Sequence, residues 1–306
     1  MMTVSDATPI EVLPRTLSSK HDLLIGGFLA RYKGQSFKAY ELDMRIWVDW
    51  CRSYGIDPIF GIERPHIELF ARYLEMERHN APASVARRLT CLRTFFWLMQ
   101  EDGVIVKSPA VNVKMPRWQV DLTKKIGLER KDYMSLMDVA RSSTPADEAL
   151  IALLGQLGLR VSEACSLNIE DFQEIERGHR VVRFVGKNTK AASMPIPIPV
   201  LRSMERAAGE RTKGPLLLRR DGTRMTRRSA DRVVKRLARK AGIQRTISCH
   251  TLRNTFVTAA LDANVPLREV QIAARHSDIR QTLMYDRGRV SLDRHAAYVV
   301  SAFMGG

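Results

Sequence analysis

The sequence has no long apolar run, and this absence excludes a helix that crosses a membrane. Its longest apolar stretches, such as Ala149 to Leu154, fall far below the roughly 20 residues that span a bilayer. Residues 1–17 also lack the basic and then apolar pattern of a secretion signal. With 45% hydrophobic and 27% charged residues, the composition is typical of a soluble globular protein. We therefore expect a cytoplasmic protein with no membrane partner.

Cysteine is scarce, and the few cysteines show no pattern typical of disulfides or metal sites. The four of them are scattered without a CxxC pair, and three lie in apolar, helix-like segments. The seven histidines include no HExxH or other close ligand set. We expect reduced core cysteines, no metal and no other cofactor.

Acidic residues are too few to balance the basic ones, which gives the chain a net charge of +16. Residues 1–130 carry 19 Lys and Arg against 15 Asp and Glu, whereas residues 131–306 carry 30 against 18. The segment 211–245 holds thirteen basic and two acidic residues. Such an excess favours a polyanionic partner. Because no bilayer-seeking apolar face accompanies it, DNA or RNA fits better than an anionic membrane.

The chain is long enough for two domains, and hydrophobic periodicity predicts that the first is a helical bundle. Apolar residues at spacings of three and four predict helices over 18–31, 36–51, 65–79 and 84–100. Periodicity then fails between residues 108 and 127, where prolines and lysines gather as in a linker. We expect a flexible amino terminus, a first domain, a linker and a second domain over residues 1–17, 18–115, 116–128 and 129–306.

Two arginines and three tryptophans of the bundle carry further expectations. In the helix over 84–100, Arg87 and Arg88 should face outward, where they could contact a nucleic acid. Trp47, Trp50 and Trp97 fall on or near apolar helical faces, and we expect them in the core instead of in a base-stacking role.

The second domain is expected to be mostly helical, with one hairpin. A capping-box start and a glycine stop predict a helix over 146–157, with Arg160 in the sharp turn that follows. A strand over 180–185 and a proline-containing return strand over 193–198 predict a hairpin at a sheet edge, with Lys187 at its tip. The expected fold is mainly α with a small β-hairpin or sheet, in two domains.

One ordered set of residue types suits phosphodiester transfer without a metal. Arginine forks donate paired hydrogen bonds to phosphate oxygens and keep their charge. Lysine can protonate a leaving oxygen, and a tyrosine becomes a nucleophile when cations stabilise its phenolate. The sequence offers the motifs GLRVSE at 158–163, HTLR at 250–253 and HSD at 276–278, and then Tyr285.

These motifs and their spacing resemble the tyrosine recombinase family, as in its Xer-like members and phage integrases. Arg253 precedes His276 by 23 residues and Tyr285 follows His276 by nine. A single motif would be weak, but the ordered set extends over about 125 residues behind a basic second half. The resemblance extends more loosely over the bundle, which is similar to the family's core-type DNA-binding domain. It implies that residues 129–306 form the catalytic domain.

The resemblance implies a role for each matching residue. Arg160 and Arg253 would clamp the scissile phosphate, His276 would add a donor, and His250 would orient or deprotonate the nucleophile, Tyr285. Lys187 would protonate the departing 5′ oxygen, with Lys190 as the alternative. Glu163 would support the active-site arginine from behind.

Two positions depart from the family pattern, and one tyrosine is a decoy. The family often has His after the HxxR arginine and Leu-Gly before the second His, whereas this chain has Asn254 and Ala274-Arg275. We expect neither position to carry the chemistry. Tyr298 lies in an apolar segment, and we expect it to be buried.

The basic segment predicts a DNA-binding helix over 226–241. Apolar residues lie on one side of it, and the other side carries Arg228, Arg232, Lys235, Arg236 and Arg239. A solvated charged face is the alternative, but a run so short of acids gains little from internal ion pairs, so phosphate contact explains it better.

The resemblance implies a homotetramer on two double-stranded DNA core sites, exchanging strands through a Holliday junction without ATP or metal. The apolar segment after Tyr285 would dock on a neighbour. We expect integration and excision of a phage or mobile element in a bacterial or phage-infected cell. The alternatives are Xer-type resolution of chromosome or plasmid dimers, a type IB topoisomerase and a silent DNA-binding regulator.

The stretch before the bundle predicts simple site requirements. Residues 1–17 carry one basic residue against two acids and few apolar residues, so we expect them not to grip a second DNA site. Directionality would then come from the site sequence or from a partner factor.

Overall fold

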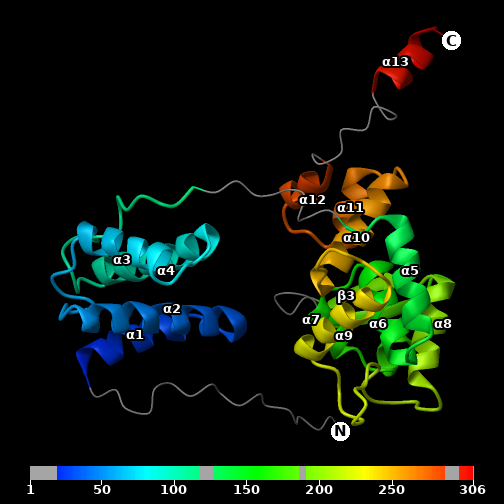
Figure 1. The fold of residues 1–306 in the computed structure, drawn as a ribbon, viewed down its shortest axis with the longest axis horizontal. Helices are drawn as coiled ribbons and strands as arrows, with labels where there is room; N and C mark the ends of the chain where they lie inside the picture. The colour runs from blue at the N-terminus through cyan, green and yellow to red at the C-terminus, as the bar shows by residue number, and fades with distance from the viewer. Residues whose placement is uncertain (1–18, 118–126, 186–190, 287–295, 306) are drawn as a thin grey trace. The chain divides into compact units, whose positions relative to one another are not determined.

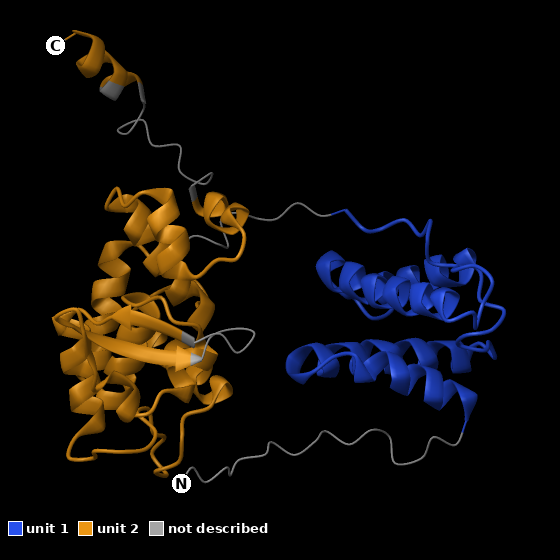
Figure 2. Cartoon of the chain, turned by 180° about the vertical axis from the view of Figure 1, so that it is seen from behind, with its two compact units in different colours: residues 1–120 blue, residues 121–306 orange. Residues whose placement is uncertain are grey.

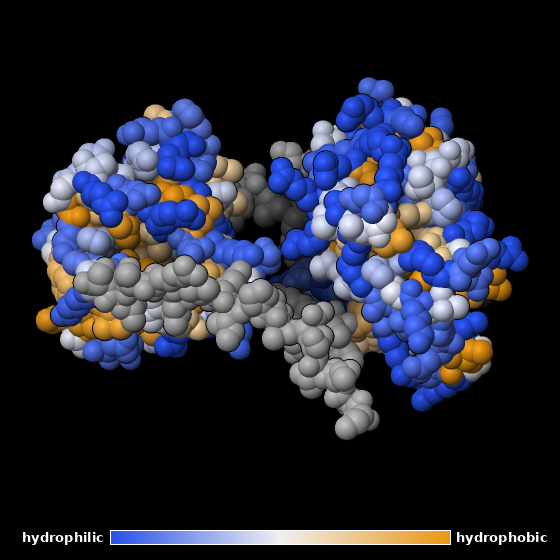
Figure 3. Space-filling view, turned by 90° about the horizontal axis from the view of Figure 1, so that it is seen from below, coloured by the Kyte–Doolittle hydropathy of each residue, from blue (hydrophilic) through white to orange (hydrophobic). Residues whose placement is uncertain are grey.

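The computed structural model describes residues 19–117, 127–185, 191–286 and 296–305. The chain divides into two compact units, residues 1–120 and residues 121–306, which Figure 2 shows in separate colours. Each unit has its own hydrophobic core. Hydrophilic side chains dominate the faces that Figure 3 shows, with hydrophobic ones scattered between them.

The first unit is a bundle of helices (Figure 1): α1 (Lys20–Ala30), α2 (Gly34–Ser53), α3 (Arg64–Met76) and α4 (Pro82–Glu101). Ser19 caps α1 by accepting a hydrogen bond from the backbone N–H of Asp22, and Pro65 lies in the first turn of α3, where its missing N–H costs nothing. Helix α2 begins at Gly34, two residues before the expected start of this helix at residue 36. The helices meet around a core of fully buried aromatic side chains: Phe28, Trp47, Phe70, Phe95 and Phe96.

The expectation that Arg88 faces outward is wrong. Arg88 is 8% exposed, and its Nε donates to Oδ1 of Asp43, a buried carboxylate on α2, at 3.3 Å. Arg87 is more exposed, but both of its terminal nitrogens also bond to Asp43. Residue 88 lies between positions 85 and 92 on the buried stripe of α4, so its charge needs an internal partner.

Two other burial expectations also fail. Trp47 and Trp50 lie in the core, as expected, but the side chain of Trp97 is 51% exposed on α4. In α13 (Ala296–Gly305), Tyr298 is 67% exposed and Phe303 is 85% exposed. An apolar sequence therefore does not bury α13 within the single chain.

The second unit is built around α6 (Pro145–Gly155), whose residues 149–154 are all 1% exposed or less. The longest apolar run of the sequence is thus a core helix, which Figure 1 shows between α9 and α8. The helices of this unit, besides α6 and α13, are α5 (Arg130–Arg141), α7 (Val161–Ser166), η2 (Glu170–Phe172), α8 (Ile198–Ala208), α9 (Arg227–Lys240), α10 (Cys249–Asp262), α11 (Leu267–Ala274) and α12 (Ile279–Asp286).

A small antiparallel sheet of order β1-β2-β3 completes this unit: β1 (Ile175–Glu176), β2 (His179–Val185) and β3 (Ala191–Pro195). Val182 pairs with Met194 in the β2–β3 register. The return strand covers residues 191–195 instead of the expected 193–198. It ends early because the chain from Ile198 is already helical. As expected for a strand with proline, β3 lies at an edge. Lys187 and Lys190 lie outside the described residues.

Within the part of the chain that the structure describes, no helix is long and apolar enough to cross a membrane. The same residues contain no group of three or more His, Cys, Asp or Glu side chains that could hold a metal ion.

Candidate active site

The turn between α6 and α7 places Arg160 and Glu163. Gly158 adopts a left-handed conformation with φ of +60°, and a Cβ there would lie 2.4 Å from the ring of Phe256, so only glycine fits. Arg160 is the amino-terminal cap of α7, and its backbone N–H donates to Oε2 of Glu163 at 2.8 Å. Its guanidinium donates to Oε1 of the same carboxylate at 2.8 Å. Glu163 therefore fixes both the backbone and the side chain of Arg160.

A second arginine, Arg275, also binds the carboxylate of Glu163. Arg275 ends α11 with φ of +54°, and its guanidinium donates to Oε2 of Glu163 at 2.7 Å. Burial opposes ionisation of Glu163, but the hydrogen bond from the Arg160 N–H and the charges of Arg275 and Arg160 lower the pKa of this carboxyl below its usual value. Arg275 also lies over the ring of Phe184, 4.9 Å from its centroid.

Arg253 lies on α10, and its side chain is held by backbone oxygens. It is 4% exposed, and its two terminal nitrogens donate to the carbonyls of Gly158 and Ala274. Burial, reinforced by the charges of Arg160 and Arg275, lowers the pKa of Arg253 to about 10. The guanidinium is still charged at neutral pH, so three cations share one small region of this unit.

His276 follows α11 and is turned toward α12. Its Nδ1 lies 2.9 Å from Oγ1 of Thr282, a fully buried side chain. The imidazole ring stacks on Tyr285 at a centroid distance of 6.2 Å and an interplanar angle of 11°. Burial and the nearby charges, that of Arg253 first, lower the pKa of His276 to about 4. The imidazole is therefore neutral at pH 7 in this state.

Tyr285 lies on α12, and its hydroxyl donates to Oδ1 of Asn254 at 2.7 Å. Burial raises the pKa of the Tyr285 phenol, and the charge of Arg253 opposes this rise. The ring packs beside the small buried cluster of Val257, Val270 and Ala274.

The structure thus brings together Arg160, Glu163, Arg253, His276 and Tyr285, from segments more than a hundred residues apart. His250 lies in the first turn of α10 and is exposed, and Lys187 lies outside the described residues. Sequence reasoning missed Asn254 and Arg275, although both positions stood out as departures from the family pattern. That departure was the one available signal, because their contacts are long-range.

The basic face of α9 is only partly available for DNA. Arg236 donates to Asp147 at 2.7 Å, and Lys235 pairs with Asp231 at 2.6 Å, so internal ion pairs do form there. Three others are exposed and have no ion-pair partner among the described residues: Arg228, Arg232 and Arg239. Helix α9 is capped by Thr226 and ends one residue earlier than expected.

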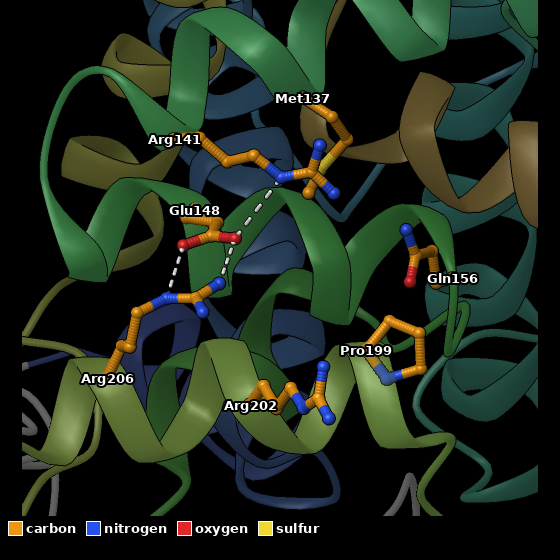
Figure 4. A pocket seen from close by; sticks show the side chains of 7 residues that line it. All are labelled: Met137, Arg141, Glu148, Gln156, Pro199, Arg202 and Arg206. Atoms are coloured by element: carbon orange, nitrogen blue, oxygen red, sulfur yellow. Dashed lines mark hydrogen bonds and ion pairs between the residues drawn. The ribbon is translucent and has the colours of Figure 1, made fainter.

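A pocket of about 480 Å³ between α5, α6 and α8 contains none of the expected site residues. Figure 4 shows Glu148 between Arg206 and Arg141, whose Nε atoms lie 3.0 and 3.5 Å from its carboxylate oxygens. Glu148 is 4% exposed, so these pairs neutralise a buried charge, and we assign them a structural role.

Residues 127–290 match the model of the phage integrase family. The tyrosine recombinase XerD of Listeria monocytogenes serotype 4b is 30% identical over 263 residues, which cover 82% of this chain and 86% of XerD. The tyrosine recombinase XerC of Myxococcus xanthus is 30% identical over 220 residues, which cover 67% of this chain and 72% of XerC.

Solved structures show the same fold. An integrase of the transposon Tn1549, in complex with circular intermediate DNA, superposes with a TM-score of 0.70 at 20% identity, over 90% of this chain and 98% of that one. A lambda integrase dimer bound to a core site gives a TM-score of 0.67 at 15% identity, over 85% and 96% of the two chains. The chain therefore belongs to the phage integrase family, the tyrosine recombinases, which are site-specific enzymes that transfer DNA strands.

Proposed function

We propose that Tyr285 is the nucleophile of this recombinase and that Arg160 and Arg253 clamp the scissile phosphate. The observation that carries the proposal is the connected set of contacts around Glu163, Gly158 and Asn254, which gathers two arginines and a tyrosine hydroxyl. Preorganised donors of this kind stabilise the charge that develops on a phosphate in the transition state. Glu163 supports Arg160 from behind, as its two hydrogen bonds suggest.

His276 would add a third donor to the phosphate. When the Thr282 hydroxyl donates to Nδ1, the neutral ring carries its proton on Nε2, which is then available as a donor. His250, exposed at the start of α10, would orient or deprotonate the phenol. Lys187 would protonate the leaving oxygen, and Lys190 remains the alternative.

The reaction follows from these roles. The Tyr285 oxygen loses its proton to a base, His250 in this proposal, and forms a bond to phosphorus as the bond to the 5′ oxygen breaks. The 5′ oxygen leaves as a hydroxyl with a proton from the lysine. The product is a 3′-phosphotyrosyl bond and a free 5′ hydroxyl. A 5′ hydroxyl of the partner strand then attacks this bond and releases the tyrosine. Because the phosphotyrosyl bond retains the energy of the broken phosphodiester, ATP is not required.

DNA binding would use both units. In the second, Arg228, Arg232 and Arg239 offer exposed charges without an ion-pair partner among the described residues. In the first, Arg87 is exposed on α4, but its pairing with Asp43 leaves its cation only partly available to a DNA phosphate. Arg88 is excluded from this surface by its burial. The domain roles are then core-site binding for residues 18–115 and catalysis for residues 129–306, joined by the linker over 116–128.

Assembly would follow the pattern of the family, with four protomers on two DNA core sites. The exposed apolar side chains of α13, Phe303 foremost, suit docking on a neighbouring protomer. Direction would come from the site sequence or from a partner factor. We place the enzyme in the cytoplasm of a bacterial or phage-infected cell.

The leading biological role is integration and excision of a phage or mobile element. The likeness to the lambda and Tn1549 integrases, one described as bound to a core site and the other to circular intermediate DNA, is compatible with it. Xer-type dimer resolution is the second candidate, since curated relatives at 30% identity are XerD and XerC proteins. Sequencing the DNA beside the gene separates them, because an integrase gene lies close to its attachment site.

Covalent trapping tests the central proposal. Purified protein is incubated with a nicked duplex from which the short 5′ hydroxyl product diffuses away, so that the covalent intermediate accumulates. We expect a protein–DNA adduct whose linked residue is Tyr285. Binding without any adduct would support a silent DNA-binding regulator, and relaxation of supercoils without strand exchange would support a topoisomerase.

A further inference from the structure

The hydroxyl of Tyr285 is held by a residue that the family pattern does not assign to catalysis. It donates to Oδ1 of Asn254 at 2.7 Å. Asn254 is 2% exposed and follows Arg253 directly on α10. The acceptor is therefore fixed by the same helical turn that carries a phosphate-clamping arginine.

A neutral amide limits what this contact can do. An amide oxygen accepts a hydrogen bond but takes no proton near neutral pH, so Asn254 is not a base. Accepting from the phenol stabilises its neutral form over the phenolate. The contact also fixes the position of the oxygen that must face the phosphorus, and effective attack depends on that position.

We propose that Asn254 is a positioning residue for the nucleophile, and that its amide oxygen holds the Tyr285 phenol, still protonated, beside Arg253 until a phosphate is bound. This inference rests on the proposed role of Tyr285. It accounts for the polar side chain buried at position 254, where the family often has histidine, a side chain whose neutral ring can also accept a hydrogen bond.

The groups around Tyr285 determine whether its phenol is protonated. Arg253 on α10 favours the phenolate, whereas burial favours the phenol. His276, stacked on the ring from the turn after α11, is neutral at pH 7. Arg160 on α7, Arg275 at the end of α11 and His250 on α10 all act on His276. A bound phosphate would accept hydrogen bonds from the arginines and partly neutralise their charge. The phenol proton must then pass to a base during attack, and Asn254 only fixes the position of the phenol oxygen before attack.

Two substitutions of nearly equal shape separate positioning from mere packing. Asn254→Asp keeps an acceptor but adds a negative charge beside the phenol, which disfavours the phenolate. We expect its rate of adduct formation on the nicked duplex to fall about tenfold at neutral pH and to recover at higher pH, with the profile displaced by about one pH unit. Asn254→Leu removes the acceptor, and we expect it to be slower at every pH, with a profile parallel to that of the unaltered chain.

A conservative variant and an activity-independent measurement complete the test. Asn254→His keeps a neutral acceptor and should retain most of the adduct-forming rate. Titration of tyrosinate by ultraviolet absorbance, with the signal of Tyr285→Phe subtracted, measures the ionisation of the Tyr285 phenol in the DNA-free protein. We expect Asn254→Asp to raise the pKa of Tyr285. Thermal unfolding and core-site binding should be close to those of the unaltered chain for each variant.

Either of two results would overturn the inference. One is parallel pH profiles for Asn254→Asp and Asn254→Leu, which would indicate packing alone. The other is an unchanged titration of Tyr285 in Asn254→Asp. If Tyr285 is not the nucleophile, the result is different, because Tyr285→Phe would still form the adduct. The titration would still report whether Asn254 bonds to the Tyr285 hydroxyl.

Discussion

Arg275 and Arg160 donate to the two different oxygens of one buried carboxylate, Glu163, at 2.7 and 2.8 Å. Arg275 does so from a left-handed backbone conformation that glycine adopts with less strain. The family often has glycine there. A strained non-glycine residue persists when the surrounding contacts hold it in place. Here the side chain of Arg275 supplies a second cation to Glu163, the carboxylate that also binds Arg160.

Arg275→Gly should therefore slow DNA cleavage while leaving the fold intact. Loss of one charge-assisted hydrogen bond costs about 1.5 kcal/mol, which corresponds to about tenfold in rate. The relaxed backbone should offset part of any loss in stability. Single-turnover cleavage and urea unfolding measure the two effects. A matched control is Arg268→Gly, on the exposed side of α11. Equal rates for Arg275→Gly and the unaltered chain would remove Arg275 from the site.

Tyr285→Phe should abolish the covalent adduct, because the lost oxygen is the proposed attacking atom. DNA binding should be nearly unchanged, because phosphate contacts dominate it. Tyr298→Phe is the control. Its hydroxyl is on the exposed side chain of α13, and it should remain active. Denaturing gels reveal the adduct and a mobility-shift assay the binding. Loss of the adduct only in Tyr298→Phe would reverse the assignment.

Lys187→Ala should cleave slowly on ordinary DNA and recover on a substrate with a 5′-bridging phosphorothioate, because sulfur leaves without a proton. Lys190→Ala serves as the comparison, since both lysines come from the same predicted turn. Cleavage rates on the two substrates measure the rescue. Rescue of Lys190→Ala together with failure to rescue Lys187→Ala would make Lys190 the acid.

Asp43→Ala should destabilise the first unit more than Arg88→Met does. Removing the carboxylate leaves Arg88 buried without its partner, at a cost of about 3–5 kcal/mol. Arg88→Met removes the buried cation itself and leaves Asp43 paired with Arg87. Urea unfolding gives the free energies. The exposed control Arg228→Met should change stability by about 0.5 kcal/mol or less. A larger cost for Arg88→Met would show that Arg88 is the dominant member of the pair.

His276 should make the stability of the second unit depend on pH. Its pKa in the folded chain is lowered from 6.5 to about 4, so between these values the unfolded chain binds more protons. Its contribution is present above pH 6.5 and is lost as the pH falls toward 4. Between pH 6.5 and about 4, the free energy of unfolding of His276→Gln should fall less than that of the unaltered chain. Unfolding by urea at several pH values tests this, and parallel curves for the two proteins would contradict it.

How much the sequence reveals depends on the range of the interactions involved. The run 149–154 predicts a helix, and the apolar periodicity of α2 and α4 predicts their buried faces, because each pattern is local. Arg88 was misplaced because its partner, Asp43, lies 45 positions away on another helix. The contacts of Asn254 and Arg275 span 31 and 112 positions, and no periodicity reports them.

The partners of Arg253 have a genetic consequence. Its terminal nitrogens bond to the carbonyls of Gly158 and Ala274, and main-chain oxygens are present whatever side chain a codon specifies. Substitutions at Ala274 that preserve the backbone should therefore leave the arginine anchored. Gly158 is different, since any added Cβ meets Phe256. Ala274 is itself fully buried, so only a small side chain fits there. Ala274→Gly should therefore stay active, whereas substitutions at residues 253 and 158 should not.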